Sequence, residues 1–170
     1  ESVEILDECR WAPPGGDVVM TDRRRFVVRL PAPNLRFVDA EITWQAERDV
    51  TIEKTNHSLF AVRAAPDITP LGGGHLVNAE GLSGEKETFG KPSAWCCYWG
   101  ARAKAKPEVV EGIALFDDPT NPWAPTPWFT RDYGFISPTP FNFLEQPWSM
   151  PAGKSVRLRY RVVVFAGTPE

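Results

Sequence analysis

Histidine is scarce in this sequence. His57 and His75 are the only two in 170 residues, and they lie eighteen residues apart. A copper or iron oxygenase needs clustered histidine ligands, and no short ligand spacing such as His-x-His indicates another metal site. Short motifs for a P-loop, a dinucleotide or a Gly-x-Ser-x-Gly hydrolase are missing as well. We therefore expect neither a metal nor an organic cofactor.

Cysteine is also rare, with Cys9 and the adjacent pair Cys96 and Cys97. Neighbouring cysteines rarely bond to each other, and an odd number leaves one thiol free. This favours a reducing, cytoplasmic location, although a periplasmic or secreted one stays open. The sequence does not set the role of Cys96 and Cys97, since a nucleophilic cysteine needs a neighbouring base and a positively charged setting.

Long apolar runs and an excess of positive charge are absent too. No window approaches the roughly 18 apolar residues of a transmembrane helix, and the net charge is -3. We therefore expect no membrane and no nucleic-acid partner. A chain of this length suits a single domain over residues 1–170 that buries about 70% of its unfolded surface. It begins at Glu1 without Met, so we expect processing or truncation upstream.

Short alternating runs separated by turn residues dominate the chain. Residues 37–46 have the clearest period of two, with one mostly polar and one apolar face. The other predicted strands are 1–12, 17–20, 23–30, 49–53, 59–64, 94–98, 110–116, 134–137 and 156–165. Only 80–87 suits a short helix, and 138–151 reads as loop. The pattern predicts an all-β antiparallel sandwich, jelly-roll or super-sandwich-like, with long functional loops.

Residues 72–134 concentrate the chemistry of the chain. Four of the seven tryptophans, His75 and two acidic clusters lie here, between many glycines and prolines. Indole faces stack on sugar C–H groups, while amides and carboxylates hold hydroxyls. We expect the 72–92 and 117–134 loops to ring a concave face that binds a small carbohydrate or sugar derivative.

Several motifs in this region carry a family resemblance. They are Asn78-Ala-Glu-Gly81, Phe89-Gly-Lys, Tyr98-Trp-Gly100, Phe116-Asp-Asp-Pro-Thr-Asn-Pro122 and Arg131-Asp-Tyr-Gly134. In order and spacing the chain resembles the bacterial domain family labelled PmoA-like or methane oxygenase PmoA. It matches the C-terminal two-thirds of that domain, which implies that it is the C-terminal part of a longer one. The resemblance implies a β-sandwich with a role in carbohydrate catabolism. Methane oxidation itself is excluded, because a membrane monooxygenase subunit needs long apolar spans.

The chain departs from this family at two histidines. Asp117-Asp118-Pro119 stands where many members have Asp-His-Pro, and Trp128-Phe129-Thr130-Arg131 stands where many have Trp-His-x-Arg. An upstream Asp-x-x-His-His-x-Gly type motif is also missing from this sequence. These departures favour a role without catalysis.

Candidate site residues follow from the central region. Glu80, Asp118 and Arg131 are the predicted catalytic residues, since a carboxylate in a partly dry cleft can act as general acid or base. The predicted substrate-binding residues are His75, Asn78, Glu85, Asn121, Trp123, Trp128 and Tyr133. Each has a structural alternative: caps and turns for the Asn, Asp and Glu residues, an ion pair for Arg131, and core packing for the tryptophans. Trp95 and Trp99 share a strand face by parity and are predicted to be core.

Three kinds of function are consistent with this sequence, one of them a purely structural β domain within a larger enzyme. The first is a hydrolase or lyase that acts on a sugar or an oxidised sugar by carboxylate chemistry. The alternative is a non-catalytic carbohydrate-binding or accessory domain, with a partner subunit or a homo-oligomer left open. Substrate, reaction type, metal dependence and oligomeric state are not fixed by the sequence.

Overall fold

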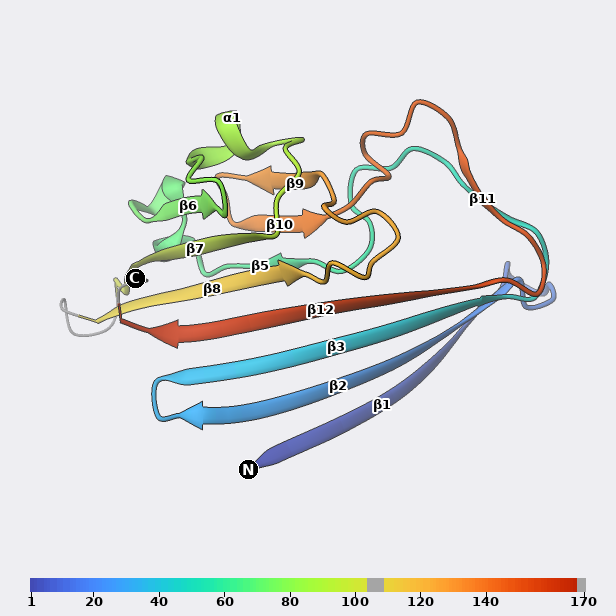
Figure 1. The fold of residues 1–170 in the computed structure, drawn as a ribbon, viewed down its shortest axis with the longest axis horizontal. Helices are drawn as coiled ribbons and strands as arrows, with labels where there is room; N and C mark the ends of the chain where they lie inside the picture. The colour runs from blue at the N-terminus through green and yellow to red at the C-terminus, as the bar shows by residue number, and fades with distance from the viewer. Residues whose placement is uncertain (104–108, 168–170) are drawn as a thin grey trace.

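The fold is built almost entirely from strands (Figure 1). The computed structural model describes residues 1–103 and 109–167. Its strands are β1 (Ser2–Trp11), β2 (Met20–Ala32), β3 (Leu35–Ala46), β4 (Val50–Ile52), β5 (Val62–Arg63), β6 (His75–Asn78), β7 (Trp95–Ala101), β8 (Val110–Asp117), β9 (Trp128–Arg131), β10 (Phe135–Pro138), β11 (Trp148–Met150) and β12 (Ser155–Ala166). The helices are η1 (Pro66–Ile68), η2 (Pro70–Gly72), both 3-10, and α1 (Gly84–Thr88). No helix in these ranges is long and apolar enough to cross a membrane.

Seven antiparallel strands form the main sheet, in the order β1-β2-β3-β12-β8-β7-β6. The last strand of the chain, β12, inserts between β3 and β8 and closes the middle of the sheet. It pairs with β3 without a break, from Ser155 opposite Gln45 to Phe165 opposite Leu35. Because side chains alternate along a strand, this register puts the even-numbered residues of β3 and β12 on one face and the odd-numbered ones on the other.

A second, smaller layer covers one half of the main sheet. Strands β5, β10 and β9 form a three-stranded sheet, and β4 pairs with β11. The Tyr98 hydroxyl of β7 donates to the carbonyls of Arg131 (2.5 Å) and Phe135 (3.1 Å), and the Trp128 indole of β9 donates to the Ser93 carbonyl (2.8 Å). In Figure 1, β9 and β10 lie beside β6–β8, whereas β1–β3 extend away from them. We call the main-sheet face toward the small sheet the inner face, and the opposite face the outer face.

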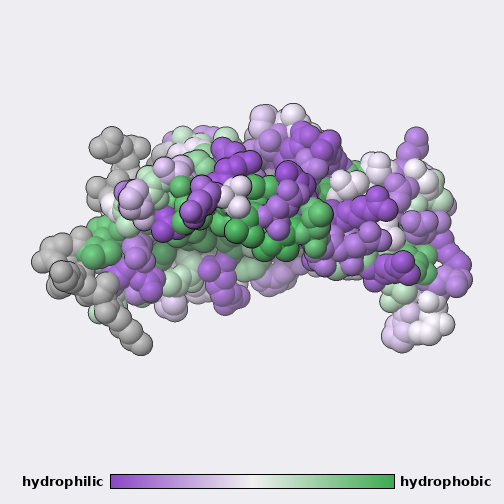
Figure 2. All heavy atoms as spheres, turned by 90° about the horizontal axis from the view of Figure 1, so that it is seen from below, coloured by the Kyte–Doolittle hydropathy of each residue, from purple (hydrophilic) through white to green (hydrophobic). Residues whose placement is uncertain are grey.

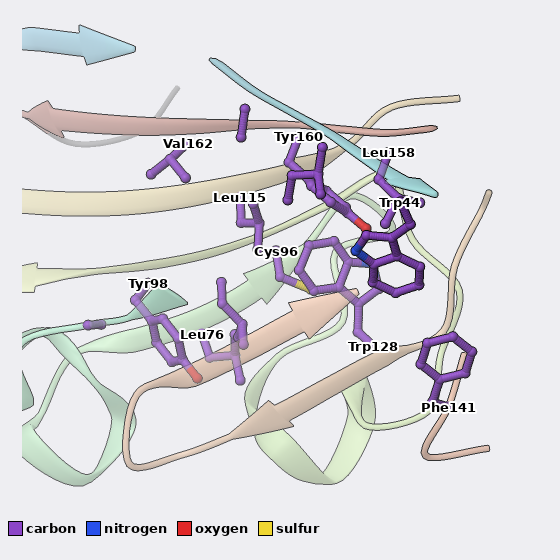
Figure 3. Close-up of a cluster of buried hydrophobic side chains, with 14 of the residues drawn as sticks. Trp44, Leu76, Cys96, Tyr98, Leu115, Trp128, Phe141, Leu158, Tyr160 and Val162 are labelled. Carbon is purple, nitrogen blue, oxygen red and sulfur yellow. The ribbon is translucent and has the colours of Figure 1, made fainter. Parts of the chain in front are cut away.

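The hydrophobic core lies between the two layers (Figure 3). Its largest fully buried side chains include Trp128, Tyr98 and Phe141. Trp44 of β3 stacks on Phe141, with ring centres 6.5 Å apart. Burial of one such side chain contributes about 1.5–3 kcal/mol. The predicted antiparallel all-β sandwich is confirmed.

The observed strands divide the chain somewhat differently from the predicted ones. The predicted strand 23–30 lies within the longer strand β2, whereas only Met20 of the predicted strand 17–20 belongs to it. The stretch 138–151, predicted to be loop, contains β11, which pairs with β4. A short helix forms within the region that suited one, as α1.

Trp95 and Trp99 are not core residues. They share one strand face, as predicted, but they are only partly buried, whereas Cys96 and Tyr98 between them are buried in the core. The two tryptophans therefore lie on the outer face. The prediction was wrong because the parity of a strand shows which residues share a face, not which face the second layer covers.

Candidate functional site

Glu85, Arg131 and Asp132 lie close together where α1 packs against β9. The Glu85 backbone N–H donates to Asp132 Oδ1 at 2.8 Å, and Glu85 Oε2 accepts from the Asp132 N–H at 3.0 Å. Glu85 Oε1 accepts from Arg131 Nη1 at 3.0 Å. The Arg131 guanidinium lies over two rings, 4.1 Å from the centre of Phe129 and 4.6 Å from that of Phe89. This cluster fastens α1 to the small sheet.

Asn78 ends β6 and shapes the turn that follows. Its Oδ1 accepts from the backbone N–H groups of Glu80 (3.2 Å) and Leu82 (2.9 Å), the arrangement of an Asx turn. Its buried Nδ2 has no hydrogen-bond partner among the described residues. Glu80 is exposed. Asn78 thus holds the turn, and Glu80 projects from it into solvent.

A second polar group forms where β8 ends beside β12. The buried Asp117 accepts from Asn121 Nδ2 at 2.7 Å and from the Thr126 backbone N–H at 3.2 Å. Asn121 Oδ1 in turn accepts from the Arg159 backbone N–H at 2.7 Å. These bonds anchor the loop that follows β8 against β12, so Asn121 is engaged in the fold.

The two predicted loop tryptophans are packed into the structure. Trp128 is fully buried. Trp123 packs edge-on against Phe141 and Trp148, with ring centres 5.3 and 5.4 Å apart. Both indoles therefore contribute to packing, Trp128 completely buried and Trp123 partly buried.

Tyr133 and His75 remain accessible. Tyr133 is 40% exposed and lies under the Arg63 guanidinium, 5.4 Å from its ring centre. His75 is exposed at the start of β6 and stacks on Trp99, with ring centres 4.1 Å apart. Because the register pairs these two residues across β6 and β7, His75 belongs to the outer face.

The predicted site residues therefore do not form one cleft. No hydrogen bond or ion pair between described residues joins the Glu85–Arg131 cluster to the group at the end of β8. Asp118 lines a hollow on the outer face, and neither Glu80 nor Arg131 is part of its lining. Of the predicted catalytic residues, Asp118 alone meets that hollow.

The hollow has a volume of about 580 Å³. It is lined by outward side chains of β2, β3 and β12 and by the end of β8. The charged and aromatic lining residues are Arg25, Arg29, Phe37, Asp39, Glu41, Phe116, Asp117, Asp118, Arg159, Tyr160 and Arg161. Arginines and carboxylates thus alternate across the floor beside aromatic rings.

Asp39 is held between two arginines from neighbouring strands. Arg161 Nε donates to its Oδ1 at 2.5 Å, and Arg29 Nη1 donates to its Oδ2. Burial acts to raise the pKa of Asp39, but the hydrogen bonds and positive charges of Arg161 and Arg29 outweigh it and hold the pKa below its usual range.

Glu41 and Asp118 are also held as anions. Arg157 Nη2 lies 2.6 Å from Glu41 Oε2, and Arg159 Nε donates to the same oxygen at 3.2 Å. These contacts lower the pKa of Glu41, Arg157 first, against the opposing effect of burial. The Thr120 hydroxyl and backbone N–H donate to Asp118 Oδ1 and lower the pKa of that carboxyl. At neutral pH all three carboxylates are ionised and accept hydrogen bonds, so none of them can act as a general acid.

Aromatic side chains continue the outer face beyond the hollow. Phe116, in the lining, packs against Trp95 with ring centres 6.1 Å apart. A Cβ added to Gly112 would fall 2.2 Å from Cζ of Phe165, so this ring lies over the β8 backbone. With Trp99, these rings form an aromatic surface next to the charged hollow.

The paired cysteines take no part in this chemistry. Cys96 points into the core, and Cys97, on the opposite face, is also buried. Burial raises the pKa of the Cys97 thiol to about 12 and that of Cys96 well above its usual range. Both therefore stay protonated at neutral pH and are poor nucleophiles. No group of three or more His, Cys, Asp or Glu side chains within residues 1–103 and 109–167 is placed to hold a metal ion.

Sequence reasoning missed most of this surface. Asp39 and Glu41 lie on the polar face of the strand with the clearest alternation, and Arg157, Arg159 and Arg161 alternate likewise in the last strand. Each strand therefore shows an alternation of charged residues in its sequence. That the carboxylates of β3 lie beside the arginines of β12 depends on the pairing of the two strands, which brings together residues more than a hundred positions apart.

These features define a two-layered antiparallel β protein whose main sheet exposes a charged and aromatic face. The sequence model of the family of unknown function DUF6807 matches residues 1–170, and the chain belongs to that family. Comparisons with curated proteins and with solved structures give no significant match. Because the function of this family is unknown, the function of the chain is inferred from the geometry and chemistry of its surface.

Proposed function

We propose that this chain is a non-catalytic carbohydrate-binding β-sandwich that uses the outer face of its main sheet. The observation that carries the proposal is the hollow of about 580 Å³, where arginine–carboxylate pairs lie beside partly exposed aromatic rings. Sugars present C–H faces and hydroxyl groups together, and rings and fixed charged groups complement both.

Binding is favoured over hydrolysis or elimination by the state of the carboxylates. A general acid at neutral pH needs a raised pKa, whereas Asp39, Glu41 and Asp118 all have lowered ones. Arg131, predicted to be catalytic, is engaged with Glu85 and stacked on two phenylalanines away from the hollow. The site therefore suits holding a sugar more than transferring a proton to it.

The family resemblance is consistent with this proposal. The motifs resembling the bacterial PmoA-like domains imply a place in carbohydrate catabolism. The two positions where this chain lacks their histidines, Asp118 and Phe129, are filled here by an ionised carboxylate and a buried ring. Both substitutions favour recognition without catalysis.

A second candidate, an accessory subunit, is favoured by a separate surface. Val3 and Ile5, which share one face of β1, are 61% and 52% exposed. Figure 2, which views the molecule from below Figure 1, where β1 lies at the edge, shows hydrophobic surface bordered by hydrophilic residues. Exposed apolar patches often mark protein contacts. Sedimentation velocity tests this candidate: a concentration-dependent dimer supports it, and a monomer at all concentrations removes the homo-oligomer.

The sugar-binding proposal is tested by thermal unfolding against a panel of neutral and acidic sugars. A ligand that binds only the folded chain raises Tm by mass action. We expect at least one sugar to raise Tm of the native chain and not of Asp39→Asn. If no sugar shifts Tm while the chain unfolds cooperatively, the proposal is wrong.

A further inference from the structure

A row of outward side chains crosses the main sheet from the hollow to the aromatic surface. Asp39 of β3 pairs with Arg161 of β12, Arg161 with Phe116 of β8, and Phe116 with Trp95 of β7. Three strand spacings separate the first residue from the last, or about 14 Å. A single hexose ring is too short to contact both ends of this row.

Four arginines, Arg25, Arg29, Arg159 and Arg161, and three carboxylates with outward side chains, Asp39, Glu41 and Asp118, line the hollow. The side chain of Asp117 is buried and bonded to Asn121 and Thr126. The hollow therefore presents charged groups of both signs to the hydroxyl groups of a sugar.

The charged groups still have hydrogen-bonding capacity for hydroxyls. Both arginines of Glu41 approach its Oε2, so Oε1 accepts no hydrogen bond from a described residue. Asp118 accepts its hydrogen bonds through Oδ1, and its Oδ2 likewise accepts none from a described residue. Arg161 donates to Asp39 from Nε, and among the described residues nothing accepts from its two terminal nitrogens. A hydroxyl can donate to the first two groups and accept from the third.

We infer that the outer face binds a linear oligosaccharide that crosses the strands from the hollow to Trp95. One end of the sugar chain donates hydroxyls to Glu41 and Asp118 and accepts from Arg161. The other end lays a ring face on the indole of Trp95. This inference rests on the proposed carbohydrate-binding function and adds to it the length of the ligand.

Calorimetric titration of the native chain tests the inference with matched probes. The probes are glucose and its β-1,4-linked di-, tri- and tetrasaccharides, with the α-1,4-linked series as a second arm. We expect affinity to rise about tenfold or more from glucose to the tetrasaccharide of one series, since a second contact region is worth about that much. The arm that binds identifies the linkage.

Two variants locate the ligand, each with a matched control. Trp95→Ala should reduce tetrasaccharide affinity about tenfold and leave glucose affinity within about twofold, while Trp11→Ala, which removes an exposed tryptophan from the inner face, should change neither. Glu41→Gln should weaken the binding of every neutral sugar. The control Glu47→Gln, at an exposed position, should weaken the binding of none. Tm of each variant checks folding, and Trp95→Phe replaces Trp95→Ala if the latter does not fold.

The possible failures separate the two proposals. If no sugar binds, the proposed function and the inference both fail. If glucose binds as tightly as the tetrasaccharide, the inference is overturned while carbohydrate binding stands. Loss of binding in Trp11→Ala and not in Trp95→Ala would place the ligand on the other face and overturn the inference.

Discussion

The two ends of the main sheet differ in what lies on their inner face. At the β7 end, the small sheet covers the inner face, and Cys96 and Tyr98 are almost completely buried. At the β1 end, nearly every residue of the strand is exposed. Residues on the outer face of β7 and β8 are therefore carried by a backbone that is packed from behind, whereas β1 is bonded only to β2. Binding surfaces are best built on such supported elements.

The largest difference should appear when a tryptophan is removed from each end. Trp128→Ala takes away a fully buried indole and its bond to Ser93 and should lower the free energy of unfolding by about 3–5 kcal/mol. Trp11→Ala, at the exposed end, should cost less than about 1 kcal/mol. Urea unfolding monitored by circular dichroism gives both values, and equal losses would contradict the two-layer account.

Arg131 tests whether its cluster serves folding or binding. Arg131→Ala removes the contact with Glu85 and the stacking on Phe89 and Phe129 and should destabilise the chain by roughly 1–3 kcal/mol. Sugar affinity of the folded variant should stay within about twofold, because Arg131 does not line the hollow. A large loss of affinity with unchanged stability would restore the prediction that Arg131 acts on substrate.

A smaller effect is expected from pH. The pKa of Asp39 is lowered in the folded state, so its contribution to stability is present above its unfolded pKa, near 4, and disappears as pH falls through the folded value. Asp39→Asn should therefore be less stable than the native chain at pH 7, by about 1 kcal/mol or less. The gap should narrow as pH falls below about 4. Urea midpoints across this range measure it, and a gap that stays constant with pH would contradict the ion-pair assignment.

The smallest effect belongs to the uncovered strand. Ile5→Thr replaces a side chain that is 52% exposed on β1 with another β-branched residue, and should change the free energy of unfolding by no more than about 0.5 kcal/mol. The same substitution at the buried Ile136 serves as the comparison and should cost several times more. A large loss at Ile5 would mean that something covers this face in solution.

The same contrast explains what the sequence could predict. Alternation in residues 37–46 identified a strand with one buried face, and turn residues identified the all-β class, because both signals are local. The Glu85–Arg131 contact and the Asp39–Arg161 pair depend on strand order, which no local pattern contains. The prediction for the polar face of β3 was right, but three of its arginine partners, Arg157, Arg159 and Arg161, come from a strand at the other end of the chain.

The candidate site was only partly predictable for a related reason. Trp123 and Trp128 stood in a proline-rich loop, and such loops often carry function, yet the loop folds back onto the core, which buries Trp128 completely and Trp123 in part. Trp95 and Trp99 stood in an apolar strand that reads as core, yet the main sheet has its second layer on the other side. Burial in a sandwich is decided by what packs on a face, and that lies outside the strand itself.

The most direct test of the central claim is a nuclear magnetic resonance titration that follows the indole N–H signals of the seven tryptophans as a neutral β-1,4-linked or α-1,4-linked glucose tetrasaccharide is added. If the outer face binds the sugar, the signal of Trp95 should shift progressively, together with that of the neighbouring Trp99, while those of Trp128 and Trp11 stay in place. If the Trp11 signal shifts and the Trp95 signal does not, or if no signal moves with either sugar, the assignment of the binding face is contradicted.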